Sequence, residues 1–301
     1  MVGLPNLIKP LEEPVLKDPY LVAAWPGIGN IGLTSVDYLR DRLEAVEFAE
    51  IEPHHFFLPH TVNIERGVFE ALKFPRSLFY YKKGERDLII FVGEMQPSAE
   101  EDIYQIANCV LDVAQHFGVK RVFTAGAAVA PIHHTMKSRV WAVPNGPELL
   151  DELRKHNVLL MSEIGERGGQ GSITGLNGLL LGVAKKRGID GVCFLGEVPM
   201  YVANFPVPYP KASLAILDVL MSSLDIKVDV KDMDYLVGRA EQEIQRVYAA
   251  LPDAVREQLD KFKTTAEAEA SYGSGPITET DKEKIMKDVE EFFGKGKEKQ
   301  T

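Results

Sequence analysis

The chain has 301 residues, of which 45% are apolar, so it is long enough for one large domain or for one domain with an appendage. Its formal net charge of −10 argues against nucleic acid or an anionic membrane as its main partner. No apolar run approaches the length of a membrane-spanning helix, and the first residues lack the pattern of a secretion signal.

Both cysteines, Cys109 and Cys193, lie in apolar segments. This placement favours buried free thiols over a disulfide, and we therefore expect a cytoplasmic protein.

Short β-rich runs alternate with helical runs between residues 20 and 225. The expected strands cover residues 20–25, 46–51, 61–71, 77–81, 87–92, 121–125 and 191–195. The expected helices cover residues 33–43, 100–117 (ending at Gly118), 148–156, 173–187 (ending at Gly188) and 211–224. This alternation predicts a three-layer α/β/α domain with a largely parallel sheet, made mixed by antiparallel hairpins within residues 61–81.

The chain changes character after Asp225, where a charged helix is expected over residues 234–251. A narrow apolar stripe runs along this helix and consists of Val237, Ala240, Ile244, Val247 and Leu251. Exposed aliphatic rows of this kind are unusual on a monomer, so Val237, Ile244, Val247 and Leu251 are candidates for a homo-oligomer interface. Packing of the stripe on its own domain is the alternative.

The last segments predict a linker and a separate helix. Residues 264–277 are small, polar and rich in helix breakers, which is typical of a linker. A helix with a capping box follows from Thr280, and Ile285, Val289, Phe292 and Phe293 lie on one side of it as candidate partner contacts. The expected organisation is an α/β core over residues 1–225, a helical extension over 226–263, the linker, and an amphipathic helix with its tail over 278–301.

The turn after the first strand of the core has the glycine spacing of a dinucleotide-binding loop, with Gly27, Gly29 and Gly32 and with Glu52 twenty residues later. The context argues against that function, because strands follow strands from residue 46 to residue 92 instead of forming β-α-β units. We therefore expect no nicotinamide cofactor. The alternative is that these glycines allow strand and helix to pack closely, with Gly27, Gly29, Asn30 and Gly32 available to bind an anion at the helix N-terminus.

A second glycine-rich segment opens the helix at residues 173–187, without the Gly-Lys-Ser/Thr ending of a phosphate-binding loop. Its glycines Gly175, Gly178 and Gly182 recur on one helix face. Since glycine inside a helix costs about 1 kcal/mol relative to alanine, we expect a neighbouring element to press against that face.

Two strands end in Gly-Glu, which places Glu94 and Glu197 at strand carboxyl ends, where open α/β sheets bind ligands. Glu94 and Glu197 are weak candidates for a catalytic acid and base. The alternative is that each accepts hydrogen bonds from a neighbouring loop. The histidines show no metal-ligand spacing, so we expect no metal site and no cofactor.

Five motifs together resemble the proteasome assembly chaperone family named after the second eukaryotic assembly chaperone. They are WPGIGNIG (25–32), GEMQP (93–97), ITGLNGLLLG (173–182), FLGEVPMY (194–201) and YPKASLAILDVL (209–220). The resemblance implies an α/β fold of the phosphorylase/hydrolase type, a homo-oligomer and a protein partner such as proteasome subunits. Some relatives end in a hydrophobic–Tyr–any-residue tail that docks into proteasome pockets, whereas this sequence ends in Lys299-Gln300-Thr301.

The function expected from these features is that of a non-enzymatic chaperone-like or scaffold protein that acts through protein–protein contacts. The alternative is an enzyme, or a binder of a small anion or nucleotide-like molecule, with its crevice near Gly27–Asn30, Glu94 and Glu197. Hydrogen bonds from backbone donors to both carboxylates would favour the first function.

Overall fold

The computed structural model describes residues 6–59, 61–163, 171–203, 208–268 and 287. The chain divides into two compact units. Unit 1 contains residues 1–126, 143–151 and 172–194, and unit 2 contains residues 127–142, 152–171 and 195–301.

The described strands form a mixed sheet of nine strands and a separate two-stranded sheet. The strands are β1 (Ile8–Pro10), β2 (Tyr20–Ala24), β3 (Val46–Ile51), β4 (Ile64–Glu65), β5 (Val68–Phe69), β6 (Ser77–Lys82), β7 (Leu88–Gly93), β8 (Arg121–Ala130), β9 (Val140–Pro144), β10 (Leu159–Leu160) and β11 (Asp190–Pro199). The order in the large sheet is β1-β3-β6-β7-β2-β8-β11-β9-β10. Strand β2 is parallel to both β7 and β8, whereas β6 is antiparallel to β3 and β7.

Helices cover both sides of the sheet, which confirms the predicted α/β class. The described helices are α1 (Ile31–Arg42), α2 (Glu100–His116), α3 (Leu150–Leu153), α4 (Gly175–Lys186), α5 (Pro210–Leu224), α6 (Lys231–Ala250) and α7 (Asp253–Ala268), with 3-10 turns η1 (Ile28–Asn30), η2 (Pro53–His55), η3 (Pro147–Leu149) and η4 (Met161–Glu163). Within the part of the chain that the structure describes, no helix is both long and apolar enough to cross a membrane.

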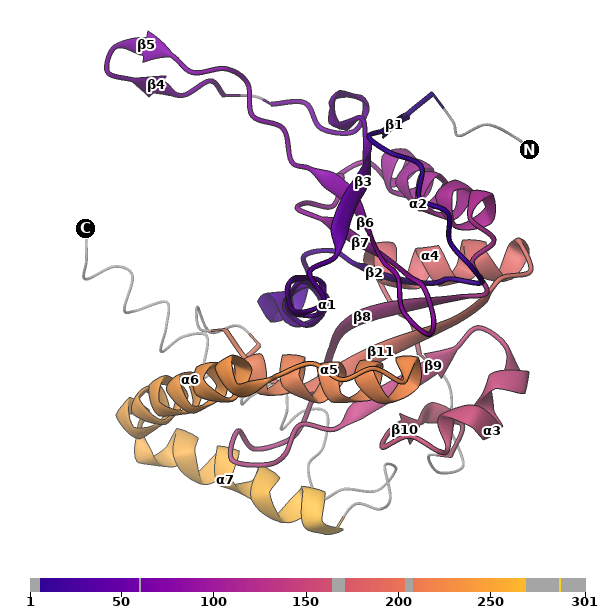
Figure 1. Cartoon of the computed structure of the whole chain (residues 1–301). Coiled ribbons are helices and arrows are strands. Elements are labelled where there is room, and N and C mark those ends of the chain that lie inside the picture. The colour runs from indigo at the N-terminus through magenta and orange to yellow at the C-terminus, as the bar shows by residue number, and fades with distance from the viewer. Residues whose placement is uncertain (1–5, 60, 164–170, 204–207, 269–286, 288–301) are drawn as a thin grey trace. The chain divides into compact units, whose positions relative to one another are not determined.

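Unit 1 has the expected three layers. Helix α1 packs on β2 and β7, while α2 and α4 pack together on the opposite face of the strands (Figure 1). Strand β2 is buried along almost its whole length, as expected of a central parallel strand covered on both faces. Helices α2 and α4 end before Gly118 and Gly188, whose φ angles of 68° and 69° confirm the predicted glycine stops.

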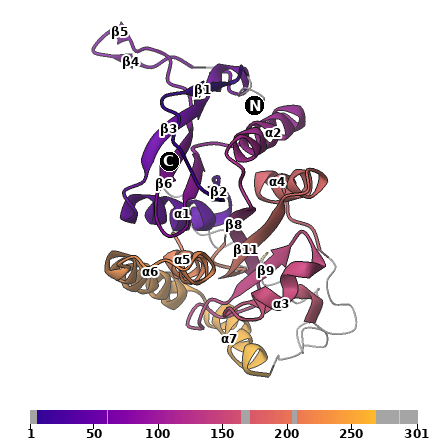
Figure 2. The ribbon, with the colours of Figure 1, turned by 45° about the vertical axis from the view of Figure 1, so that its right-hand side comes forward.

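Unit 2 contains the helices that follow the sheet. Helices α5 and α6 pack side by side, and α7 follows them (Figure 2). Ile244 of α6 and Leu259 and Phe262 of α7 are almost completely buried, so both helices are anchored by core side chains. The buried side chains of α7 lie at helical spacing, within the helical extension expected over 226–263, although a separate helix after residue 251 was not predicted.

Unit 1 also extends an arm, defined as residues 58–73, in which β4 and β5 pair only with each other among the described strands. A two-residue turn at Arg66 and Gly67, both with positive φ, joins the two strands. The arm projects away from the rest of unit 1 (Figure 1). An antiparallel hairpin expected within residues 61–81 is therefore confirmed, with its turn at Arg66 and Gly67.

Several of the observed elements differ from the expected ones. The helix expected over 148–156 is a 3-10 turn followed by the single turn α3, and β9 was not predicted. Helix α7 runs to Ala268, inside the segment expected to be a linker from residue 264. The rest of that linker, and Ile285, Val289, Phe292 and Phe293 of the expected last helix, lie outside the described residues.

Candidate functional site

The turn after β2 needs its glycines for backbone reasons. Gly29 has a φ of 59°, and Asn30, with a φ of 50°, is also left-handed. A Cβ atom on Gly32 would lie 2.1 Å from the carbonyl oxygen of Ala125 in β8. The expected close approach of helix and strand is therefore confirmed at Gly32. Gly27 has no such contact, because a Cβ there would meet nothing within 4 Å.

One side chain, Gln96, joins three loops of unit 1. Its Nε2 donates to the carbonyl oxygen of Pro26 at 2.6 Å, and its Oε1 accepts from the backbone N–H of Leu176 at 3.1 Å. The loops after β2 and β7 and the start of α4 are thus held together. The sequence analysis includes Gln96 only within the GEMQP motif. Its bridging role was not predicted, because no local pattern shows which loops meet.

The glycines of α4 do not share one neighbour. A Cβ on Gly178 would lie 2.2 Å from the carbonyl oxygen of Ile173, and one on Gly175 would lie 2.8 Å from Oε1 of Gln96. A Cβ on Gly182 would meet open space. The expectation of a smooth face pressed by another element is therefore wrong at Gly182.

Glu94 lies at the exposed end of β7. Its carboxylate accepts from the backbone N–H of Arg76 at 2.9 Å, and its own N–H donates to the carbonyl oxygen of Arg76 at 2.9 Å. Glu94 therefore closes the end of the β6–β7 pair, as the hydrogen-bonding alternative expects.

Glu197 is fully buried in unit 2. Its carboxylate accepts from Nε and Nη2 of Arg139 at 2.8 and 2.9 Å, and from Nε1 of Trp141 at 3.0 Å. The hydroxyl of Ser138 donates to the carbonyl oxygen of Glu197 at 2.5 Å. The guanidinium of Arg139 thus compensates the charge of the buried carboxylate, and the groups that donate to this carboxylate from Arg139 and Trp141 are side-chain groups.

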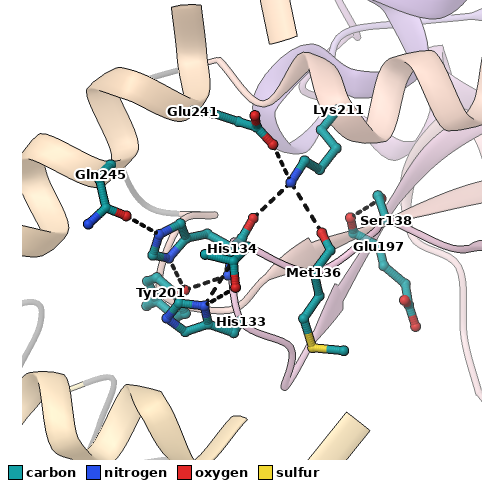
Figure 3. Close-up of polar contacts among 10 residues, drawn as sticks. His133, His134, Met136, Ser138, Glu197, Tyr201, Lys211, Glu241 and Gln245 are labelled. Atoms are coloured by element: carbon teal, nitrogen blue, oxygen red, sulfur yellow. Dashed lines mark hydrogen bonds and ion pairs between the residues drawn. The ribbon is translucent and has the colours of Figure 1, made fainter. Parts of the chain in front are cut away.

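A polar cluster in unit 2 surrounds His134 (Figure 3). The backbone N–H of His134 donates to the Tyr201 hydroxyl at 2.7 Å, and the same hydroxyl lies 2.7 Å from Nδ1 of the ring. The ring Nε2 lies 3.1 Å from Oε1 of Gln245. Because the amide oxygen of Gln245 accepts, Nε2 carries the proton and Nδ1 accepts from Tyr201. The imidazole is thus satisfied in its neutral form.

The neighbouring His133 lies against α6 and α7. Its Nδ1 is 2.8 Å from the hydroxyl of Thr135, and its Nε2 is 3.6 Å from a carboxylate oxygen of Asp260 in α7. The hydroxyl of Tyr248 in α6 donates to the same oxygen at 2.5 Å. The cluster therefore connects the segment after β8 with both C-terminal helices.

Lys211 reinforces this connection from α5. Its ammonium donates to the carbonyl oxygens of His134 and Met136 at 2.9 and 3.2 Å and pairs with Glu241 of α6 at 2.5 Å (Figure 3). Sequence reasoning missed this cluster, because its members are separated in the chain by more than a hundred residues, as His134 and Gln245 are. The adjacent histidine pair His133 and His134 is the local signal of this cluster, and its spacing by itself predicts no partner.

Burial sets the protonation of this cluster. Desolvation, together with the neighbouring His134 and Lys263, lowers the pKa of His133 to about 3, while Asp260 opposes this shift. Desolvation also lowers the pKa of His134 and raises the pKa of Tyr201. Both imidazoles are consequently neutral in the folded protein at neutral pH.

We expect acid to weaken unit 2 through these histidines. Below pH 6.5 the unfolded chain binds protons that folded His133 refuses down to about pH 3, so the stabilisation present at neutral pH is lost as the pH falls. One histidine contributes about 1.4 kcal/mol per pH unit, or about 2 kcal/mol between pH 6.5 and pH 5. Urea unfolding at both pH values measures the difference.

The variant His133→Phe replaces the imidazole with an aromatic ring that cannot be protonated. Its stability should therefore fall less on acidification than that of the unmodified protein. His54→Phe, at an exposed histidine, is the matched control and should keep the full pH dependence. Equal pH dependence in His133→Phe and the unmodified protein would contradict this assignment.

Unit 2 also contains a cavity of about 210 Å³. Its lining residues are Lys137, Ser138, Arg139, Val140, Asn157, Val158, Leu159, Ala215, Asp218, Val219 and Ser222. Burial raises the pKa of the Asp218 carboxyl, and the nearby Lys137 opposes that rise. The lining includes neither Glu94, Glu197 nor any residue of the glycine turn.

Among the described residues, no group of three or more His, Cys, Asp or Glu side chains is placed to hold a metal ion.

The apolar stripe of α6 packs mostly within the chain. Ile244 and Leu251 are buried and Val237 and Val247 are half-buried, and α5 packs against α6. Ile244 and Leu251 are thus buried within their own chain, whereas Val237 and Val247 keep part of their surface exposed, and an oligomer interface through this stripe stays a prediction.

Comparisons with known proteins identify relatives over most of the chain. The model described as "PAC2 family" matches residues 21–248. A structure of Pyrococcus furiosus PbaB, described as an archaeal proteasome activator, is 30% identical with a TM-score of 0.67, and the match covers 80% of this chain and 97% of that one. An uncharacterised Methanocaldococcus jannaschii protein is 24% identical over 241 residues, covering 80% of this chain and 85% of that protein.

A third relative, described as the Mycobacterium tuberculosis proteasome-assembly chaperone homologue Rv2125, is 22% identical with a TM-score of 0.65. The match covers 81% of this chain and 99% of that one. At this identity the likeness shows the fold alone.

Proposed function

Because this chain belongs to the PAC2 family, we propose that it is a chaperone-like protein that acts as a homo-oligomer on proteasome subunits, in proteasome assembly or activation. The observation that carries the proposal is the 30% identity, over nearly the full length of that chain, to PbaB, which is described as a proteasome activator.

The placement of the two candidate carboxylates supports a non-enzymatic role. Glu94 closes a strand pair through the backbone of Arg76, and Glu197 is buried against Arg139 and Trp141. Both carboxylates are thereby used to hold local structure. The two free cysteines are buried, in agreement with a reducing compartment such as the cytoplasm.

The proposal is tested by purifying the tagged protein from its native host and identifying proteasome subunits among the bound proteins. Purified subunits are then mixed with it, and complex formation is followed by sedimentation velocity. We expect a defined complex with proteasome subunits and a change in the yield of assembled, peptide-hydrolysing proteasome. Absence of binding by purified subunits would overturn the proposal.

Glu94→Gln is the matched variant for the enzyme alternative, because Glu94 is exposed and its amide replacement still accepts from Arg76. We expect this variant to bind proteasome subunits as the unmodified protein does. If the unmodified protein turned over a substrate, and Glu94→Gln lost that turnover but still bound proteasome subunits, Glu94 would instead be a catalytic group.

A further inference from the structure

The arm carries a concentration of exposed apolar side chains. Leu58 is 76% exposed, Phe69 74%, Val68 69% and Ile64 64%, and Val62 and Leu72 are also exposed. Single exposed apolar side chains are ordinary, but six within one short hairpin indicate an interaction surface.

The arm is held together by its own contacts. The backbone N–H of Glu70 donates to the carbonyl oxygen of Asn63, and the carboxylate of Glu70 pairs with Lys73 at 3.4 Å. An isolated two-stranded hairpin is only marginally stable in water, so burial of its apolar side chains against another surface would stabilise it.

We infer that the arm docks on a second copy of this chain and thereby builds the homo-oligomer; the inference rests on the oligomeric part of the proposed function. Charge favours this occupant. The described arm residues include two acids, Glu65 and Glu70, and two bases, Arg66 and Lys73, whereas the whole chain carries −10. A neutral arm with Arg66 exposed at its tip approaches an acidic second copy without net repulsion.

The surface that fits the arm lies at the corner between β7 and α2, which we define as Met95, Glu100, Glu101 and Tyr104. Met95 is 50% exposed and Tyr104 is also exposed, next to the exposed acids Glu100 and Glu101. This β7–α2 corner is thus apolar and acidic, which complements an apolar arm with a cationic tip. Arm and corner belong to the same unit and are both exposed there, so they are free to meet between copies.

The arm presents apolar side chains on both faces. Ile64 pairs with Phe69 and Glu65 pairs with Val68, so Ile64 and Phe69 lie on one face of the hairpin and Val68 lies on the other. Arm and corner are different surfaces, so each copy donates one arm and receives another.

The first test replaces two exposed arm residues with glutamate, in the variant Val68→Glu/Phe69→Glu. We expect its mass in sedimentation velocity to fall to that of a single chain, while circular dichroism and the melting temperature stay as in the unmodified protein. The matched control is Val15→Glu, which changes an 84% exposed valine of the same unit outside the arm and should keep the assembled mass.

The second test traps the contact. One tagged copy carries Val68→Cys and a differently tagged copy carries Met95→Cys, and the native Cys109 and Cys193 do not interfere because they are buried. We expect a disulfide between the two tagged copies. Replacing Met95→Cys with Val15→Cys in the second copy should abolish it.

A single-chain mass for the unmodified protein, an unchanged mass for Val68→Glu/Phe69→Glu, or no trapped disulfide would overturn the inference. An arm variant that keeps its mass but no longer binds purified proteasome subunits would place the client on the arm, overturning self-docking while supporting the proposed function. Failure of the unmodified protein to bind those subunits would overturn the proposed function, whatever its mass.

Discussion

Gly32→Ala should destabilise the protein by about 3 kcal/mol, because the added Cβ would lie 2.1 Å from the carbonyl oxygen of Ala125 and 2.8 Å from the N–H nitrogen of Gly126. Both obstacles are backbone atoms of a central strand, so neither moves without disturbing the sheet. Thermal unfolding should show a fall of about 6–12 °C in melting temperature.

The sign of this effect is informative. Gly32 lies in the first turn of α1, where alanine would otherwise favour the helix by up to about 1 kcal/mol. Gly27→Ala is the matched control in the same turn, since it has an extended backbone and open space at its Cβ, and we expect a change within about 0.5 kcal/mol. An unchanged or raised melting temperature for Gly32→Ala would show that helix and strand are not in close contact there.

Arg139→Leu should cost about 3–5 kcal/mol, because it leaves the fully buried carboxylate of Glu197 without its charged partner. Urea unfolding at pH 7 measures this loss. The surface variant Arg76→Leu is the matched control, since Arg76 also contacts two carboxylates, those of Glu47 and Glu50, but at an exposed site. We expect it to cost no more than about 1 kcal/mol.

The double variant Arg139→Leu/Glu197→Gln separates charge from shape. The amide that replaces the carboxylate at position 197 is uncharged and still accepts from Nε1 of Trp141. Most of the stability lost in Arg139→Leu alone should therefore return. If the double variant were as unstable as Arg139→Leu alone, the loss would come from packing of the arginine side chain and not from an uncompensated charge.

Local pattern predicted most of the core elements. The apolar run at β2 and the helix of α2 follow from hydrophobic periodicity, and the ends of α2 and α4 follow from Gly118 and Gly188, because only glycine adopts positive φ without strain. The family resemblance likewise came from motifs that are contiguous in the chain, and the family model confirms it over residues 21–248.

Weak local signals explain the elements that were missed. Helix α3 is a single turn, so its apolar residues are too few to show a helical repeat. Strand β9 is short, and its pairing depends on segments that are distant in the chain. Helix α7 has polar residues on most of its surface, and only burial of Leu259 and Phe262 in the fold identifies its inner face.

The sequence by itself determined the α/β class, the glycine turn and the position of Glu94 at the end of β7, because each depends on residues that are neighbours in the chain. The expected position of Glu197 at a strand end is wrong, because β11 continues to Pro199 and Glu197 lies inside it. Only the tertiary structure decided what these groups contact: Gly32 meets Ala125, Gln96 joins Pro26 to Leu176, and His134 meets Tyr201 and Gln245. Such contacts join residues far apart in sequence, and their partners are selected by sheet order and helix packing, which no local spacing specifies.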